Sequence, residues 1–131
     1  MPYENPFLAK YYEPVIACLK NARELITKYE NWTIIAQART TETLMCSYED
    51  ADAVQFCAVG ACMRAIEERP ENECKPSLRN ICRKRLNDAA TKLYGKGTMQ
   101  LNDEKKTRRK KTHKKILRVY DEAIRELESH Q

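Results

Sequence analysis

Apolar side chains recur every three or four positions along most of the chain, which is the spacing of helices that bury one face. This spacing predicts helices over about 15–29, 77–94 and 110–127. The second of them is expected to end at Gly95, because glycine readily adopts the left-handed conformation that terminates a helix. Most of the chain is therefore expected to be helical.

A fourth helix is predicted over about 52–68, and its composition differs from that of the others. Within 53–66 only Gln55 and Arg64 interrupt a run of apolar or small side chains. A helix that is apolar on all sides is normally buried, so we place this one at the centre. Gly60 within it favours close packing against another backbone, since glycine otherwise weakens a helix by roughly 1 kcal/mol relative to alanine. We expect five residues to be buried in the bundle: Cys57, Ala58, Ala61, Ile81 and Ile124.

The segments between these helices are less regular. Residues 32–46 fit either a short helix or an extended piece, residues 67–76 form a polar loop, and residues 99–103 form a short connector. Residues 1–13 carry aromatic side chains between prolines, which suggests an ordered arm or a short helix packed on the body.

Composition supports the helical interpretation. The chain of 131 residues has only three glycines, and it is rich in residues that lose little freedom in a helix. A chain of this length can bury one core. We therefore predict an all-α fold, a compact bundle of about five helices around the central apolar helix 53–66. It forms a single domain over 1–131, with an N-terminal arm over 1–13 and a basic loop and helix start over 104–115.

The chain has six cysteines: Cys18, Cys46, Cys57, Cys62, Cys74 and Cys82. The N-terminal sequence has neither the basic nor the apolar segment of a secretion signal, so we expect a cytoplasmic protein with reduced thiols. Several of the cysteines fall at core-facing helical positions, where free cysteine behaves as a small hydrophobic residue. No stretch reaches the roughly 20 apolar residues of a membrane span, so no membrane association is expected.

Positive charge is concentrated in residues 105–118. This segment holds no acidic residue and nine basic ones: Lys105, Lys106, Arg108, Arg109, Lys110, Lys111, Lys114, Lys115 and Arg118. Because the whole chain has a net charge of +5, the remainder is net acidic. Like charges repel one another, so a segment with no use for them would be expected to mix basic and acidic residues, as the end of the last helix does.

The basic segment favours a non-enzymatic interaction module that binds nucleic acid or an acidic protein. Each basic residue that meets a phosphate releases counterions, which produces salt-sensitive binding with little sequence preference. The alternative is a solvated helix start that has no partner.

A second candidate site is formed by Asn102 and Asp103. They lie where a loop enters the last helix, and such side chains commonly satisfy free backbone N–H groups there. The alternative is a small-ligand or nucleotide site formed by Trp32, Asn102 and Asp103 beside the central helix, because buried amide and carboxylate groups recognise ligands by directed hydrogen bonds.

Catalytic chemistry has weaker support in the sequence. Cys57 could act as a nucleophile if a base stabilised its thiolate, and His113 is the one histidine outside the C-terminal tip. Asn102 or Asp103 would then orient the imidazole. There is no Cys-x-x-Cys motif and no glycine-rich phosphate loop, so we expect no metal site and no cofactor. These observations together argue against an enzyme.

Two motifs carry a resemblance to a known family. Residues 56–61 read Phe-Cys-Ala-Val-Gly-Ala, and residues 101–103 read Leu-Asn-Asp ahead of a helix with Thr112 near its start. The chain resembles an uncharacterised family of small helical proteins from bacteria and their phages, which has an aromatic-Cys-Ala-x-Gly-Ala helix and an Asn-Asp motif before the last helix. The likeness spans about residues 15–125 and includes Trp32, although the family has an aromatic residue before its Asn-Asp pair.

This resemblance implies a helical fold and a bacterial or phage origin, and it implies no activity. A role as a phage or mobile-element regulator, or as an inhibitor of a host system, rests on the same analogy.

Overall fold

The computed structural model describes residues 10–105 and 107–130, so the predicted arm lies largely outside the described residues. Five α-helices lie within these ranges: α2 (Tyr12–Leu25), α3 (Ala58–Glu67), α4 (Lys75–Tyr94), α5 (Thr98–Asn102) and α6 (Arg109–Glu128). The remaining elements are a 3-10 turn and three short strands: η1 (Tyr29–Asn31), β1 (Ala38–Arg39), β2 (Met45–Cys46) and β3 (Gln55–Phe56). The predicted helical bundle is confirmed, with a small sheet added to it.

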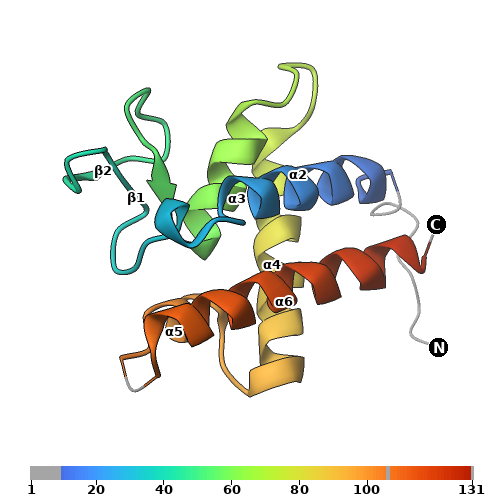
Figure 1. The fold of residues 1–131 in the computed structure, drawn as a ribbon. Helices are drawn as coiled ribbons and strands as arrows, with labels where there is room; N and C mark the ends of the chain where they lie inside the picture. The colour runs from blue at the N-terminus through green and yellow to red at the C-terminus, as the bar shows by residue number, and fades with distance from the viewer. Residues whose placement is uncertain (1–9, 106, 131) are drawn as a thin grey trace.

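Helices α2 and α6 lie side by side and run in opposite directions, and α4 crosses them (Figure 1). Two ion pairs join α2 to α6, Lys20 with Glu128 and Arg23 with Asp121. Their order along the two helices agrees with the antiparallel arrangement. The sheet, α5 and the first turn of α6 lie at one end of this helix pair. That end therefore brings together the loop-rich part of the chain and its basic segment.

Helix α3 is the central helix, as predicted, and it contacts α2, α4 and α5. Its start was predicted wrongly: the helix begins at Ala58, whereas residues 55–56 form β3 and pair with β1. The reason is physical, because an apolar run is compatible with a buried strand as well as with a buried helix. Cys57 is the N-cap, and its Sγ accepts the Gly60 N–H at 3.2 Å.

Gly60 makes the close backbone approach that its position in the central helix predicted. A Cβ at this position would lie 2.0 Å from the carbonyl oxygen of Gln37. The same carbonyl accepts the N–H of Cys57 at 3.1 Å, which holds the segment before β1 against the start of α3. Only a residue without a side chain fits between the two segments.

The other helix boundaries follow local signals. Helices α4 and α6 match their predicted ranges to within two residues at each end, and α4 ends at Gly95, whose φ is 70°. Helix α2 begins three residues earlier and ends four residues earlier than predicted, since Pro14 occupies its first turn and Tyr29 belongs to η1. The predicted connector over 99–103 is largely helical, because its residues 99–102 belong to the short helix α5.

The segment 32–46, which fitted either a short helix or an extended piece, contains extended structure. Its strands β1 and β2 pair antiparallel, and β1 also pairs with β3, so that the strand order is β2-β1-β3. Buried aromatic and apolar side chains join this sheet to the helices, among them Trp32 and Phe56.

All six cysteines are free thiols. Cys18, Cys62 and Cys82 belong to the hydrophobic core and Cys57 is also buried, whereas Cys46 is half-buried and Cys74 is exposed. Of the five residues predicted to be buried, Ile81 is only half-buried and packs on the core from its edge. Over the described residues, no helix has the length and apolar character needed to cross a bilayer.

Candidate nucleic-acid interface

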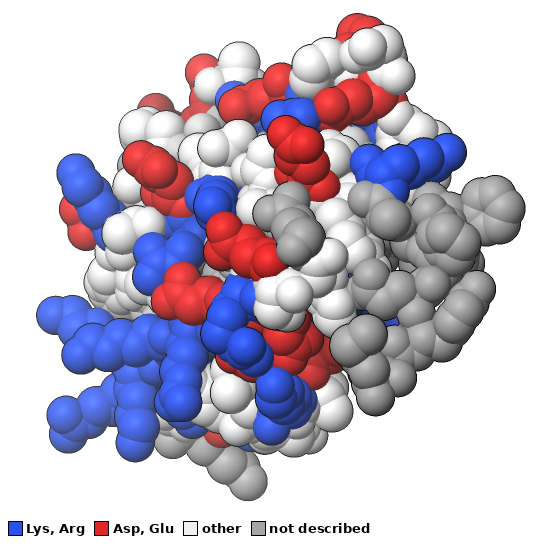
Figure 2. Space-filling view, turned by 90° about the vertical axis from the view of Figure 1, so that its right-hand side faces the viewer, with Lys and Arg blue, Asp and Glu red and all other residues white. Residues whose placement is uncertain are grey.

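The basic segment folds into the loop before α6 and the first half of that helix. Seven of its eight described members have exposed side chains and Lys115 is half-buried, whereas Lys106 lies outside the described residues. We call the following set the basic surface: Lys105, Arg108, Arg109, Lys110, Lys111, Lys114, Lys115 and Arg118. Figure 2 shows a corner of the molecule where Lys and Arg side chains gather with little acidic surface between them.

The protein itself neutralises little of the basic surface: Lys96 and, more weakly, Lys115 lower the pKa of Glu104, and the ion pair of Glu104 is with Lys96. No member of the basic surface forms an ion pair with a carboxylate of the described chain. Many other basic residues do form such pairs: Lys20, Arg23, Arg64, Arg69, Lys75, Arg79, Lys84, Lys92, Lys96 and Arg125. Unpaired cations are therefore concentrated in this surface, although a few others lie elsewhere on the described chain.

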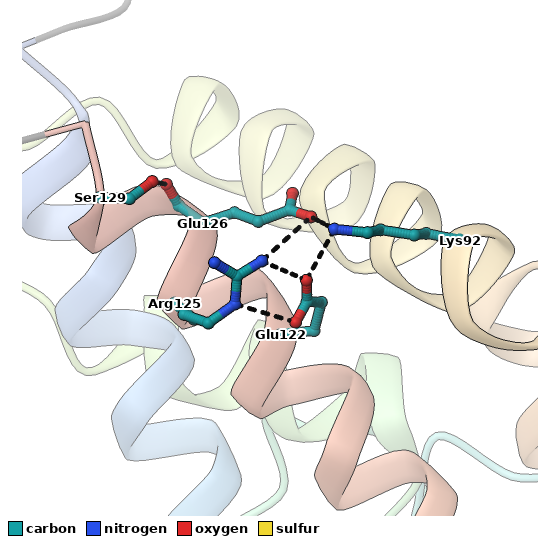
Figure 3. Close-up of polar contacts among 5 residues, drawn as sticks. All are labelled: Lys92, Glu122, Arg125, Glu126 and Ser129. Carbon is teal, nitrogen blue, oxygen red and sulfur yellow. Dashed lines mark hydrogen bonds and ion pairs between the residues drawn. The ribbon is translucent and has the colours of Figure 1, made fainter.

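The second half of α6 shows the opposite arrangement (Figure 3). There Glu122 accepts hydrogen bonds from Arg125 and from Lys92, and Lys92 also bonds Glu126. The Arg125 guanidinium, with the Lys92 ammonium, lowers the pKa of Glu122 to about 2. One helix thus has an unpaired cationic half and a mutually neutralised half.

The start of α6 is electrostatically unfavourable as an isolated helix. Arg109, Lys110 and Lys111 occupy its first three positions, where the free N–H groups already place partial positive charge. The first turn contains no acidic residue, and the N-cap residue Arg108 makes no side-chain capping bond. This clustering of positive charge lowers local stability, so it requires an explanation outside helix formation.

Packing holds the cationic start of α6 rigidly in place. His113 is buried, its Nε2 lies 2.6 Å from the carbonyl oxygen of Ile26, and its ring meets the rings of Tyr29 and Trp32 at 5.6 and 5.5 Å between centroids. Lys110 also contributes, because its ammonium lies 5.8 Å from the centre of the Tyr29 ring. The basic surface is therefore presented on a fixed support.

The structure brings Trp32, Asn102 and Asp103 together, as the second candidate site requires. Asn102 is fully buried, and its Oδ1 accepts the indole N–H of Trp32 at 2.7 Å and the backbone N–H of Ala58 at 3.0 Å. Its Nδ2 donates to the carbonyl oxygen of Thr33 at 3.2 Å and to Asp103 Oδ1 at 2.9 Å. All the hydrogen-bonding capacity of the Asn102 amide is therefore used inside the protein.

These bonds give Asn102 and Asp103 structural tasks. Asn102 accepts a free backbone N–H at the start of α3, a helix that is distant in the chain. The expectation was that it would cap the helix that follows Asn102 in the chain. Asp103 Oδ1 accepts the N–H of Ile35 at 2.8 Å, and Ile35 has a φ of 72°, which is unusual for a β-branched residue. The pair thus fixes the loop that contains Ile35 against the central helix.

Cys57 and His113 occupy unrelated structural positions. The Cys57 side chain is 1% exposed, and burial raises the pKa of its thiol although the Gly60 N–H opposes this effect. A nucleophilic cysteine requires the reverse shift. In the part of the chain that the structure describes, no hydrogen bond joins Cys57 to His113, and no group of three or more His, Cys, Asp and Glu side chains could hold a metal ion.

A pocket of about 270 Å³ lies beside the basic surface and was not predicted from the sequence. Its lining comes from η1, the loop after η1, strand β1, the loop between β1 and β2, strand β3 and the start of α6: Tyr29, Glu30, Trp32, Thr33, Ile34, Arg39, Thr43, Gln55 and Arg109. Trp32 was a candidate for a site and Arg109 belongs to the basic surface. No sequence signal could have joined them to Arg39, because the three are neighbours only through the fold.

Comparison of the chain with protein-family models, with curated proteins and with solved structures finds no match.

Proposed function

We propose that the protein is a non-enzymatic module that binds nucleic acid through the basic surface. The observation that supports this proposal is the set of eight described cations without a carboxylate partner, on a chain whose other cations are mostly paired. Concentrated positive charge that lowers local helix stability is expected where a partner supplies the compensating negative charge.

Geometry favours a phosphate backbone over an acidic protein as that partner. Residues 109–118 of α6 cover about 14 Å at 1.5 Å per residue. One strand of duplex DNA places a phosphate about every 3.4 Å along its axis, so about four phosphates fit this length. An acidic protein would need several carboxylates clustered at a matching spacing.

Two broader inferences belong to the same proposal. The buried thiols of Cys18, Cys57, Cys62 and Cys82 are free, and a cytoplasmic location would keep them reduced. A bacterial or phage origin is inferred from the family resemblance alone.

The test is fluorescence anisotropy with labelled DNA over a range of salt concentrations. We expect the wild-type affinity to fall steeply with salt and to depend little on sequence. The triple variant Arg109→Gln, Lys110→Gln, Lys111→Gln should lower the log–log salt slope by about 2–3, because each lost phosphate contact removes about 0.7–0.9. The same variant should unfold at about the wild-type temperature, because removing cations from the positive end of the helix dipole offsets the loss of the Lys110 contact with the Tyr29 ring.

A matched control removes the same charge elsewhere on the protein. Lys20→Gln, Arg83→Gln, Lys84→Gln changes three exposed side chains outside the basic surface. This control should retain the wild-type slope to within about 0.5, since only phosphate-contacting cations contribute to it. Absence of wild-type binding at low salt, or equal weakening by the control, would refute the proposal.

A further inference from the structure

The pocket beside the basic surface combines aromatic, cationic and hydrogen-bonding groups. Trp32, which is 5% exposed, and half-buried Tyr29 contribute rings whose centroids are 6.1 Å apart. Gln55 donates from Nε2 to the backbone carbonyl of Glu30 at 2.8 Å, and no described group bonds its Oε1. A planar ligand that carries hydrogen-bond donors could therefore contact the parts of these rings that line the pocket and a free amide oxygen.

Two guanidinium groups in the pocket have no carboxylate partner among the described residues. Arg39 donates from Nε to Thr33 Oγ1 at 2.8 Å, from Nη1 to the Thr43 carbonyl oxygen at 3.0 Å and from Nη2 to the Ile34 carbonyl oxygen at 3.3 Å. Its position is therefore fixed while its charge remains without a carboxylate partner. Arg109 is exposed and unpaired. Glu30, the one carboxylate that lines the pocket, is exposed and pairs with neither of them.

The pocket and the basic surface are continuous. Arg109 belongs to both, and the Lys110 ammonium lies over the ring of Tyr29, which lines the pocket. A strand whose phosphates contact Arg109 and Lys110 would therefore pass the pocket mouth. The pocket, at about 270 Å³, is large enough for one planar base.

We propose that the nucleic acid bound by this protein is single-stranded, and that one unpaired base enters the pocket of Tyr29, Trp32, Arg39, Gln55 and Arg109. This inference rests on the proposed function and specifies its substrate class. Base stacking on aromatic rings tolerates any sequence, which agrees with backbone-dominated binding. A duplex would have to unstack and unpair a base before it could use the pocket, so single strands bind more tightly.

The first experiment compares three labelled probes of equal length, about 16 nucleotides, which covers the usual single-strand site size. They are a thymidine homo-oligomer, the same backbone with abasic spacers in place of every base, and a duplex. We expect the thymidine strand to bind about fivefold to a hundredfold more tightly than the abasic strand, with the same salt slope. Trp32 is the sole tryptophan, so its fluorescence should be quenched by the thymidine strand and not by the abasic one.

A matched pair of variants separates the pocket from the surface. Arg109→Gln and Arg118→Gln each remove one exposed cation of the basic surface, and only Arg109 lines the pocket. Both should lower the single-strand salt slope by about 0.7. Only Arg109→Gln should also reduce the affinity difference between thymidine and abasic strands.

The outcomes distinguish this inference from the proposed function. Equal binding of thymidine and abasic strands, or of single strand and duplex, would overturn the inference and leave nucleic-acid binding standing. Failure of all three probes to bind at low salt would remove the proposed function, and an acidic protein would replace nucleic acid as the partner to test.

Discussion

Asn102→Ala tests the hydrogen-bond network that joins α5 to the central helix. The substitution removes four hydrogen bonds from a fully buried amide. The Trp32 indole N–H, the Ala58 N–H and the Thr33 carbonyl then lose their partner in the core. Each unsatisfied buried group costs about 1–3 kcal/mol. Since water can reach part of the space that the side chain leaves, we expect the free energy of unfolding to fall by about 3–5 kcal/mol.

Urea unfolding followed by far-UV circular dichroism and by Trp32 fluorescence measures this loss. Asn87→Ala is the matched control, because Asn87 Oδ1 also accepts two hydrogen bonds, from the N–H and the hydroxyl of Thr98. Asn87 is exposed, so water can replace it, and the expected loss is about 1 kcal/mol, typical of a helix cap. Similar losses for the two variants would show that burial of the Asn102 network does not matter and would refute the reasoning.

Asn102→Asp adds a dependence on pH. The new carboxylate would keep both acceptor roles but would face the Thr33 carbonyl and the Asp103 carboxylate, to which the amide now donates. Burial and this neighbouring charge favour the protonated form in the folded state. The folded-state pKa is then above the unfolded value, so the variant should regain stability relative to wild type as pH falls towards about 4. A stability difference from wild type that is constant with pH would contradict this explanation.

Two further predictions concern packing and ion pairs. Gly60→Ala should lower the free energy of unfolding by about 2 kcal/mol or more, because the new Cβ meets a backbone carbonyl at 2.0 Å. Gly97→Ala is the control, because its Cβ has an ordinary contact at 3.6 Å. It should change the free energy of unfolding by less than about 1 kcal/mol in the same urea titration. Arg125, with Lys92, lowers the pKa of Glu122 from 4.5 to about 2, so this ion pair stabilises the fold above pH 4.5 and the contribution is lost as pH falls towards 2. Glu122→Gln should therefore cost about 1 kcal/mol at neutral pH and progressively less below pH 4.5, and an unchanged difference between the two proteins at both pH values would contradict this.

The helices that could be predicted from the sequence are those with local start and stop signals. The α4 helix has an apolar stripe and a glycine, Gly95, that adopts the left-handed conformation at its end. The α6 helix has the same regular stripe. The start of α3 has no such signal, because residues 53–57 are mostly apolar like the helix, and within them Gln55 and Phe56 pair with β1.

The candidate site also has one feature that the sequence predicts, its charge, and one that it does not, the pairing of that charge. Charge is a property of the residues themselves, so the cationic segment could be located without the structure, and its exposure follows from the high cost of burying unpaired charge. Whether carboxylates elsewhere in the chain neutralise it depends on distances through space. Lys92 pairs with Glu122 and Glu126, thirty or more residues away, whereas no described carboxylate forms an ion pair with the basic surface.

The sequence by itself thus determined the helical periodicity, the central position of the apolar helix and the concentration of positive charge, since each depends on residue type and short-range spacing. Only the tertiary structure decided that Asn102 caps the start of α3 at Ala58, and that Arg39 and Arg109 line one pocket with Trp32. These partners lie tens of residues apart in the chain. Hydrogen bonding and pocket formation act over a few ångströms of space, so such pairs have no signature in the local order of residues.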